Sequence, residues 1–364
     1  MWNLWDSEKL VNDIEIHGNT ETGKEFIASI EKKKFLFSFV ISYTETCEIP
    51  GITIAGTNLD MLKFTPPADA EFLHYGQCKC TEKIPMTPDG TPTPAILTKV
   101  ALEASSIPQV VINAGSKIPP ELPYFETGLE SGKNITKEPG LDRYFVLRGI
   151  EYGRIIGRTL ASVTDCLVIG ESIPGGTTTA MAVLKGFGID AKVSSSMREN
   201  PMELKNKVVK EAMERSKSKD PYDVVAHLGD PMIPIVAGMI SSATRTTKVI
   251  LAGGTQMAAI LALGHYTGYN EKNIAIGTTS YIVNDMTANF LDTIKEINDI
   301  PIFSVEPKLK DSKIKGLQAF SNGFVKEGAG AGGSIIAAML KTGIDSQKFL
   351  NLTENEYQRV FTLQ

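Results

Sequence analysis

The chain has 364 residues, of which 42% are hydrophobic and 22% are charged, so it can bury the core of one large domain or two smaller ones. Its 37 basic and 42 acidic residues give a formal net charge of −5, which provides no electrostatic attraction to nucleic acid or to an anionic membrane. The 32 glycines and the low aromatic content of 7% favour many tight turns between strands and helices over a sandwich of aromatic strands.

The N-terminus and the cysteines indicate the compartment. No run of about 18 apolar residues occurs, and the first residues are acidic where a secretory signal is basic and then apolar, so we expect a cytoplasmic protein without a membrane span. Four cysteines do not form a disulfide framework in a chain of this length. His74, Cys78 and Cys80 lie close together, but no second Cys or His pair follows at the spacing of a zinc site. A turn with two thiols is therefore favoured, and no metal is expected.

The predicted elements alternate between strand and helix. Residues 1–33 are charged and weakly patterned, with Trp2 and Trp5 as expected anchors and a helix predicted over about residues 21–33. From there the chain repeats a short apolar, β-branched run followed by a helical stretch, which is the pattern of parallel βαβ construction in an α/β fold. The strands predicted in this way span residues 35–41, 109–113, 165–169, 190–193, 223–228, 248–251, 273–276 and 301–305.

Glycine and hydroxyl residues gather directly after several of these strands. In an open parallel sheet, ligands bind beyond the carboxyl ends of the strands. Any one such loop is explained as a tight turn with a helix cap, but five of them at one edge favour a binding site. The five loops are residues 113–116, 170–172, 229–230, 252–255 and 277–280.

Residues 63–94 depart from the alternation because they carry many prolines. We predict a long ordered loop or a small excursion there, and residues 117–140 are similar. Long loops in a compact domain are usually functional.

The sequence GESIPGGTTT, residues 170–179, stands between a predicted strand and a helix. Its spacing is close to that of a phosphate-binding loop, but Gly176 stands where such a loop has its lysine. That lysine serves the β and γ phosphates, whereas backbone N–H groups and the helix dipole suffice for one phosphate. The motif therefore predicts a monophosphate site and argues against an NTPase. The alternative is a glycine turn with Thr177 as the helix N-cap.

The sequence KEGAGAGGS, residues 326–334, matches a dinucleotide-binding pattern literally through Gly328, Gly330 and Gly333. No apolar strand precedes it and too few residues follow for a βαβ unit, so we reject that interpretation. Glu327 beside the glycines is a candidate general base, because partial desolvation would raise its pKa. The alternative is a helix-start residue favoured by the helix dipole.

Other catalytic classes have little support in the sequence. With four histidines and no G-x-S-x-G, H-E-x-x-H or EF-hand spacing, hydrolytic triads and the common metal motifs are disfavoured. The acidic pair that common phosphoribosyltransferases use for magnesium and pyrophosphate is also absent.

The two glycine motifs together resemble the nicotinate-nucleotide-dimethylbenzimidazole phosphoribosyltransferase family, especially its archaeal-type homologues, over about residues 91–340. These enzymes build the lower-ligand nucleotide of cobamides such as vitamin B12. A family segment G-E-M-G-I-G-N-T-T resembles residues 170–178, and a segment G-E-G-T-G with the catalytic glutamate resembles residues 326–330. Lys207 is similar to the family's phosphate-contacting lysine.

The resemblance implies a Rossmann-like parallel sheet flanked by helices, as a large domain of residues 34–310. A smaller helical domain would consist of residues 1–33 plus 311–364 and carry the catalytic glutamate. It also implies a homodimer without cofactor or metal, whose substrates are nicotinate mononucleotide and an aromatic nitrogen base.

The resemblance further implies roles for individual residues. Glu327 takes the proton from the azole nitrogen, whose lone pair attacks the ribose as nicotinate leaves, giving an α-ribazole 5′-phosphate type product. The phosphate and nucleotide contacts are Gly175, Gly176, Thr177, Thr178, Lys207, Gly328 and Gly330. The cleft is lined by Glu171, Gly253, Gly254, Thr278, Thr279 and Ser280.

The chain departs from the family pattern at three places. Residues 42–45 replace a G-D-H-G segment, Gly176 replaces an asparagine and Ala329 replaces a threonine, which leaves the acceptor base open. Two alternatives remain: another sugar-phosphate or nucleotide enzyme, and a non-catalytic nucleotide-binding protein.

Overall fold

The computed structural model describes residues 13–54, 58–87 and 90–362, so Trp2 and Trp5 lie outside the described residues. The strands form one sheet of eight in the order β1-β8-β7-β6-β5-β2-β3-β4. Each neighbouring pair is parallel except β1 and β8, which are antiparallel. The strands are β1 (Ile14–His17), β2 (Phe35–Ile41), β3 (Gln109–Asn113), β4 (Phe125–Glu126), β5 (Cys166–Ser172), β6 (Lys248–Ala252), β7 (Ile274–Thr279) and β8 (Ile302–Val305).

The strand order reverses between β2 and β5. From β2 the chain adds β3 and β4 on one side, and then crosses to the other side to add β5, β6, β7 and β8. This is the doubly wound arrangement, in which the two crossovers leave a crevice at the carboxyl ends of the two central strands. The α/β prediction with a Rossmann-like parallel sheet is therefore confirmed.

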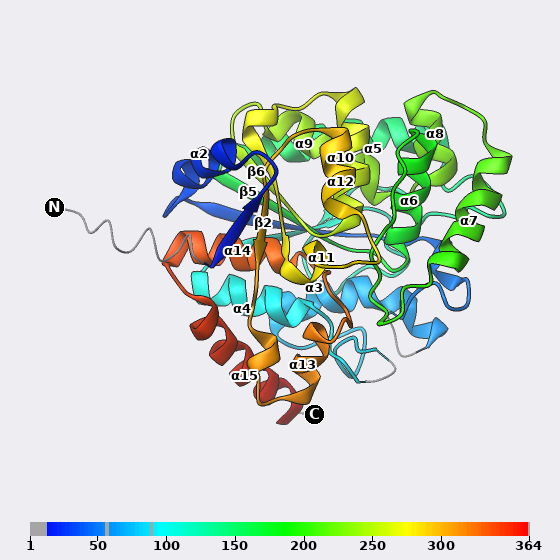
Figure 1. Ribbon diagram of the computed structural model, residues 1–364. Helices are drawn as coiled ribbons and strands as arrows, with labels where there is room; N and C mark the ends of the chain where they lie inside the picture. The colour runs from blue at the N-terminus through cyan, green and yellow to red at the C-terminus, as the bar shows by residue number, and fades with distance from the viewer. Residues whose placement is uncertain (1–12, 55–57, 88–89, 363–364) are drawn as a thin grey trace.

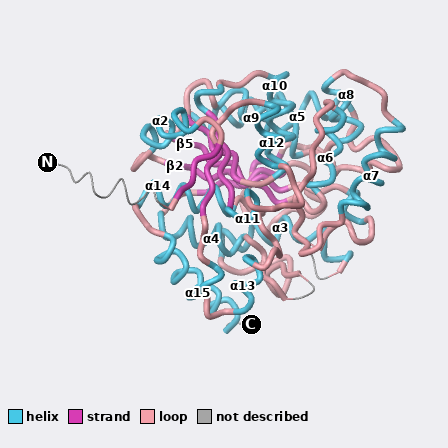
Figure 2. The backbone as a smooth tube through the Cα atoms, viewed as in Figure 1, coloured by secondary structure: helices cyan, strands magenta, loops and turns pink. Residues whose placement is uncertain are grey.

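Helices cover both faces of the sheet (Figures 1 and 2). The central strands are apolar on both sides: in β2, Phe37 and Phe39 face one core whereas Leu36 and Val40 face the other. One layer holds α5 (Arg143–Ala161), α6 (Gly176–Gly186), α7 (Met202–Arg215), α8 (Pro221–Leu228), α9 (Met232–Ala243), α10 (Thr255–Thr267) and α12 (Phe290–Ile297). The other holds α2 (Thr20–Ile30), α3 (Thr65–Tyr75), α4 (Ala95–Ser105), α13 (Lys315–Ser321), α14 (Ala331–Thr342) and α15 (Ser346–Thr362). The short α11 (Ser280–Val283) follows β7, and four 3₁₀ turns are η1 (Glu45–Glu48), η2 (Leu59–Phe64), η3 (Glu271–Asn273) and η4 (Leu309–Asp311).

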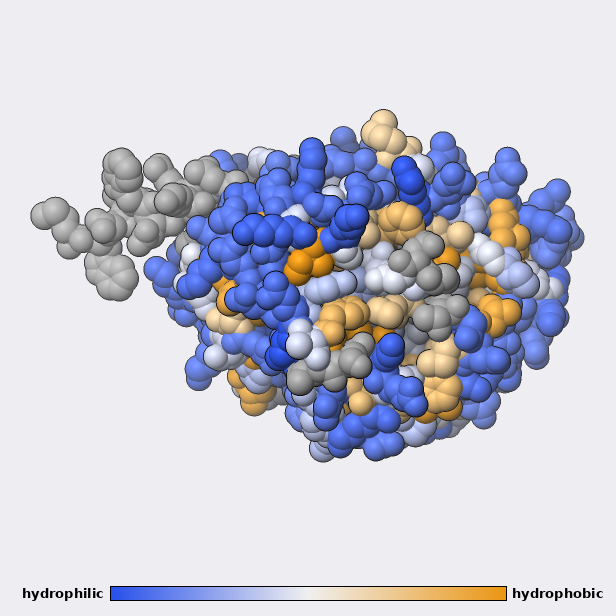
Figure 3. Space-filling view, turned by 90° about the horizontal axis from the view of Figure 1, so that it is seen from below, coloured by the Kyte–Doolittle hydropathy of each residue, from blue (hydrophilic) through white to orange (hydrophobic). Residues whose placement is uncertain are grey.

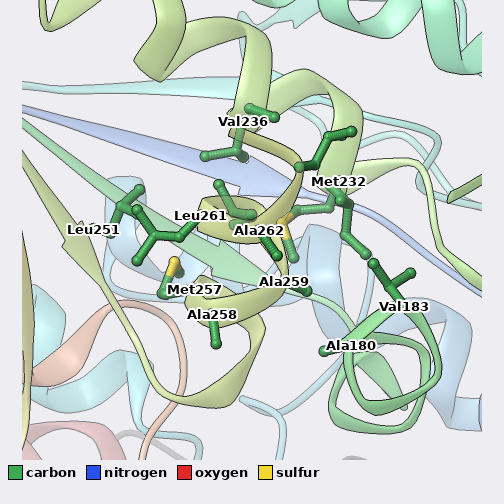
Figure 4. Packing of buried hydrophobic residues seen from close by; sticks show 14 of the residues in the cluster. Ala180, Val183, Met232, Val236, Leu251, Met257, Ala258, Ala259, Leu261 and Ala262 are labelled. Atoms are coloured by element: carbon green, nitrogen blue, oxygen red, sulfur yellow. The ribbon is translucent and has the colours of Figure 1, made fainter. Parts of the chain in front are cut away.

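Small residues bring the helices of the first layer close together. Figure 4 shows side chains of α6, α9 and β6 converging on α10, where alanines alternate with larger apolar residues. A Cβ atom added to Gly153 of α5 would lie 2.1 Å from the carbonyl oxygen of Ile235 in α9. The contact between these two helices therefore requires glycine.

Two predicted strands are wrong. Residues 223–228 lie in α8, because Asp220 caps the helix by accepting from the N–H groups of Tyr222 and Asp223, and Pro221 occupies the first turn. Residues 190–193 form a loop whose backbone is paired with Asn289 instead of a neighbouring strand. A short apolar run in the sequence does not by itself distinguish a strand from a helix or a loop.

Two further regions differ in part from the sequence prediction. The helix predicted over residues 21–33 is present as α2, but β1 precedes it and joins the sheet. The region 63–94 begins with α3, since the prolines at the start of that helix need no backbone N–H partner. The proposed division into a large and a small domain stays a prediction; α14, from the C-terminal part, packs in the core beneath the sheet.

None of the helices in the described ranges is both long and apolar enough to cross a lipid bilayer. Figure 3 shows the face seen from below Figure 1, where small groups of hydrophobic residues lie among near-neutral ones toward the middle and hydrophilic residues cover most of the margins.

Candidate active site

A pocket lies beyond the carboxyl end of β5, at the reversal of the strand order. Ser172, the last residue of β5, pairs with Ile41 at the end of β2 and lines the pocket together with Glu171. Further walls come from segments far apart in the chain: residues 52–54, Thr65 and Asp69, residues 85–87 and 91–94, 173–177, 194–196, 254–256, Ile282, Val325 and 327–329.

The turn between β5 and α6 presents the start of a helix to the pocket. Gly175 has φ +77°, and a Cβ atom there would lie 2.9 Å from the Cβ of Cys47, so the turn requires glycine. Gly175 is itself the N-cap and has no side chain to cap α6, so the interpretation of Thr177 as N-cap is wrong. An uncapped helix start with a positive dipole end is suited to an anion.

Glu327 lies on the loop before α14 and is partly exposed to the pocket, while donors surround its carboxylate. Its Oε2 accepts from the backbone N–H of Thr279 at 2.9 Å and from the hydroxyl of Thr278 at 3.2 Å. Its Oε1 accepts from the N–H groups of Gly328 and Gly332 at 3.1 and 3.2 Å. Burial raises the pKa of Glu327, and these hydrogen bonds oppose the increase. The residue thus both supports the start of α14 and lines the pocket.

The glycine run after Glu327 packs α14 against the sheet. A Cβ on Gly332 would lie 2.1 Å from the carbonyl carbon of Thr278, and one on Gly333 would lie 2.4 Å from the Cβ of Ala252. A Cβ on Gly330 would likewise lie only 3.0 Å from the Cα of Gly170. Two glycines of this run were predicted to contact the nucleotide: Gly328 lines the pocket, whereas Gly330 faces the sheet.

Glu171 is a second carboxyl group of the pocket, and it is buried. Its side chain accepts from the amide of Gln256 at 3.3 Å and from the backbone N–H of Ile173. Burial, together with the negative charges of Asp230 and Glu327, raises the pKa of Glu171 to about 8. Asp230 lies behind it, where its carboxylate accepts from Thr179 at 2.5 Å and caps α9.

Lys207, the predicted phosphate ligand, does not reach this pocket. It is exposed on α7 and borders a separate hollow with Glu45, Glu48 and Glu211. Lys205, two residues earlier, is completely buried, and its Nζ donates to the carbonyl oxygen of Ser194 at 2.8 Å.

The loop of Ser194 and Ser195 lines the pocket and rests on two buried lysines. Lys326 donates to the carbonyl of Ser195 and forms an ion pair with Asp285, each at 3.2 Å. Burial lowers the pKa of Lys205 to about 7.

The remaining predicted residues lie around the pocket without lining it, except Gly254. Thr278 and Thr279 stand behind Glu327, and Gly253 packs on Met257. Ser280 donates to Glu306 at 2.6 Å in another hollow. The buried Thr178 hydroxyl has no partner among the described residues.

In the part of the chain that the structure describes, no three or more His, Cys, Asp or Glu side chains are arranged to hold a metal ion. The thiol of Cys78 donates to the carbonyl of Ala68.

Known proteins similar to this chain come from archaea and from a bacterium. It is 45% identical to a UPF0284 protein of Archaeoglobus fulgidus over 331 residues, which covers 91% of this chain and 95% of the relative. A UPF0284 protein of Sulfurisphaera tokodaii is 44% identical, with the same shares covered. The chain belongs to the UPF0284 protein family.

This UPF0284 protein also matches a phosphoribosyltransferase family model over residues 100–279, and it is an enzyme of the phosphoribosyltransferase class, a type of glycosyltransferase. The crystal structure of CobT from Thermus thermophilus has the same fold, with a TM-score of 0.60, 14% identity and 95% of each chain covered. A nicotinate-nucleotide-dimethylbenzimidazole phosphoribosyltransferase from the same organism gives a TM-score of 0.56 at 15% identity, covering 88% of this chain and 86% of the other.

Sequence reasoning missed several walls of the pocket in this UPF0284 protein. Asp69 and Thr93 come from the proline-rich region, whose only signal was its departure from the alternating pattern. Lys205 had a clearer signal. It shares the buried face of α7 with Val208, Val209 and Ala212, at helical spacing, so a lysine on that stripe faces inward.

Proposed function

We propose that the enzyme transfers the phosphoribosyl group of nicotinate mononucleotide to an aromatic nitrogen base. The products are nicotinate and an α-ribazole 5′-phosphate type nucleotide, for the lower ligand of a cobamide such as vitamin B12. The observation that carries the proposal is one pocket that combines the uncapped start of α6 with the carboxyl groups of Glu327 and Glu171.

The phosphate fits best at the start of α6. Gly175, Gly176 and Thr177 offer backbone and the positive end of the helix dipole to a single phosphate group. We assign the supporting role to Lys205 in place of Lys207, because the Nζ of Lys205 holds the pocket loop through the carbonyl oxygen of Ser194.

The two glutamates suit different tasks. A general base must begin ionised, and four donors stabilise the carboxylate of Glu327, whereas two groups, the Gln256 amide and the Ile173 N–H, donate to that of Glu171. Glu171, with a pKa near 8, holds its proton at neutral pH and serves as a hydrogen-bond donor to a substrate oxygen or nitrogen.

The reaction then balances without another reactant. Glu327 takes the N–H proton of the base, and the nitrogen lone pair forms a bond to C1′ of the ribose from the face opposite the leaving group. The electrons of the breaking C1′–N bond neutralise the pyridinium of nicotinate, which leaves. Alignment of two bound substrates and one carboxylate supplies much of the catalysis. A homodimer, implied by the resemblance, stays a prediction.

The test is to mix the protein with nicotinate mononucleotide and a panel of bases, including benzimidazoles and adenine, and to follow nicotinate release by chromatography. Release that depends on a base, with a new nucleotide of the expected mass, supports the proposal. Tight nucleotide binding without release for any base would instead favour a binding protein. Release without added base would indicate a nucleotide hydrolase.

A further inference from the structure

Asp69 is a third buried carboxyl group in the pocket, and neither glycine motif contains it. It lies on α3, outside residues 100–279, and is only 3% exposed. Its Oδ1 accepts from the hydroxyl of Thr93 at 2.7 Å, and its Oδ2 accepts from that of Ser172 at 2.8 Å. A carboxylate can accept about four hydrogen bonds, so two donors leave acceptor positions open toward the pocket.

No cation of the described residues forms an ion pair with Asp69. Asp69 is among the groups that raise the pKa of Glu171, and burial raises the pKa of Asp69 itself to about 7. A buried carboxyl group without a cation is costly, and a hydrogen-bond donor of a ligand would reduce that cost.

The wall around Asp69 continues to Glu327. Thr93 is followed by Pro94, which lies so close to Gly328 that an added Cβ there would be 2.8 Å from the Cγ of Pro94. Pro85, Met86 and Pro92 add apolar surface to the same wall. Flat apolar walls with one polar group suit a planar aromatic ring that is recognised at one edge.

Charge decides which aromatic ring lies there. The described residues place no cation beside Asp69, so the carboxylate of nicotinate finds no counter-ion there, and the phosphate is assigned to the start of α6. The acceptor base carries no such charge, and its attacking nitrogen must lie beside Glu327. The opposite edge of the base then faces Asp69.

We propose that Asp69 is a specificity residue that selects an acceptor base with an N–H or O–H donor on the ring edge opposite the attacking nitrogen. This inference rests on the proposed function and names its substrate class: amino- or hydroxyl-substituted benzimidazoles and aminopurines such as adenine. Methyl groups at that edge leave the acceptor positions of Asp69 unpaired, so dimethylbenzimidazole is the poorer substrate.

The test uses one series of acceptors with saturating nicotinate mononucleotide: 5-amino-, 5-hydroxy-, 5-methyl- and 5,6-dimethylbenzimidazole, together with adenine. We expect kcat/KM at least about tenfold higher for the amino and hydroxyl compounds than for the methyl compounds. Asp69→Leu should reverse this order. Asp69→Asn keeps the shape and one carbonyl acceptor, so it should weaken the preference for amino and hydroxyl compounds without reversing it. If Asp69→Leu does not fold, the asparagine variant provides the test.

The outcomes separate this inference from the proposed function. If no base releases nicotinate, the proposed function fails. If bases react but the methyl compounds are equal or better substrates of the unaltered enzyme, Asp69 does not select a donor and the inference is wrong. The same conclusion follows if the order of substrates is unchanged in both Asp69 variants.

Discussion

At the scale of single residues, the two glutamates of the pocket differ in what surrounds them. Glu327 accepts from four donors, whereas Glu171 accepts from the Gln256 amide and the Ile173 N–H. Both carboxyl groups are desolvated, so both pKa values rise, but the donors around Glu327 limit its increase. This difference in hydrogen-bond donors is the reason why we assign Glu327 as the general base and Glu171 as the protonated acid.

Glu327→Gln should abolish turnover while binding of nicotinate mononucleotide changes little. The amide cannot take a proton, and loss of a general base costs about 10²- to 10⁴-fold in rate. Nicotinate release gives kcat, and calorimetry gives the dissociation constant of the nucleotide. Turnover that stays within about threefold of the unaltered enzyme would remove Glu327 from the mechanism.

Glu171→Gln should stabilise the fold at alkaline pH and have little effect on stability near pH 5. The folded protein binds the proton of Glu171 more tightly than the unfolded chain, because the pKa is about 8 in the fold and 4.5 ordinarily. Stability contributed by that proton is present at low pH and is lost as the pH rises from about 4.5 through about 8. Thermal unfolding at pH 5 and pH 9 checks this. A variant whose Tm relative to the unaltered protein does not rise between the two values would contradict it.

Lys205→Met should weaken nucleotide binding by about tenfold or more, whereas Lys207→Met should leave it unchanged. Methionine keeps the bulk of the buried side chain but not its charge or its bond to Ser194. The exposed Lys207 is a matched control two residues away on the same helix. Titration with nicotinate mononucleotide measures both. Equal effects of the two substitutions would contradict the assignment of Lys205.

At the scale of elements, the start of α14 is held by glycine contacts with the sheet. Gly332→Ala places a Cβ 2.1 Å from the carbonyl carbon of Thr278, so the helix or the strand must shift. We expect a loss of about 1–3 kcal/mol in the free energy of unfolding. Because Gly332 also donates to Glu327, turnover should fall as well.

Denaturant titration of this variant should be compared with that of Lys348→Ala, at an exposed position of α15. An exposed substitution changes stability by about 0.5 kcal/mol or less. If the two variants unfold at the same denaturant concentration, the packing of α14 does not depend on Gly332.

The helices and strands also show how much of the structure could be predicted from the sequence. Apolar runs predicted six of the strands because a parallel sheet buries both faces of its strands. They misassigned residues 223–228, where Asp220 caps a helix, and residues 190–193, whose backbone pairs with Asn289. The glycine turn after β5 and Glu327 were found because their neighbours are distinctive. Asp69 was not found, since its partners Thr93 and Ser172 meet it only in the folded chain. The register of α7 buries Lys205 and exposes Lys207, and a resemblance of motifs does not contain that register.

At the scale of the whole molecule, one pocket joins both helix layers to the sheet. Asp69 comes from the layer of α3, the phosphate turn from the layer of α6, and Glu171 from the sheet between them. A ligand in this pocket therefore contacts every layer, and its binding free energy adds to the stability of the entire fold.

Nicotinate mononucleotide should raise the Tm of the protein in a concentration-dependent way, since a ligand at about 100 times its dissociation constant adds about 2.7 kcal/mol to the free energy of unfolding. Gly175→Ala should lose most of this shift. Its Cβ would meet Cys47 at 2.9 Å and the residue must keep φ +77°, so the turn that presents α6 to the phosphate distorts. Gly188→Ala has a similar φ of +87° but open space around it, so it bears the same backbone strain away from the pocket. Thermal unfolding with and without nucleotide compares the three proteins. If the nucleotide raises the Tm of Gly175→Ala as much as that of the unaltered protein, the phosphate binds elsewhere. If Gly188→Ala keeps the Tm shift and Gly175→Ala loses it, the phosphate binds at the start of α6.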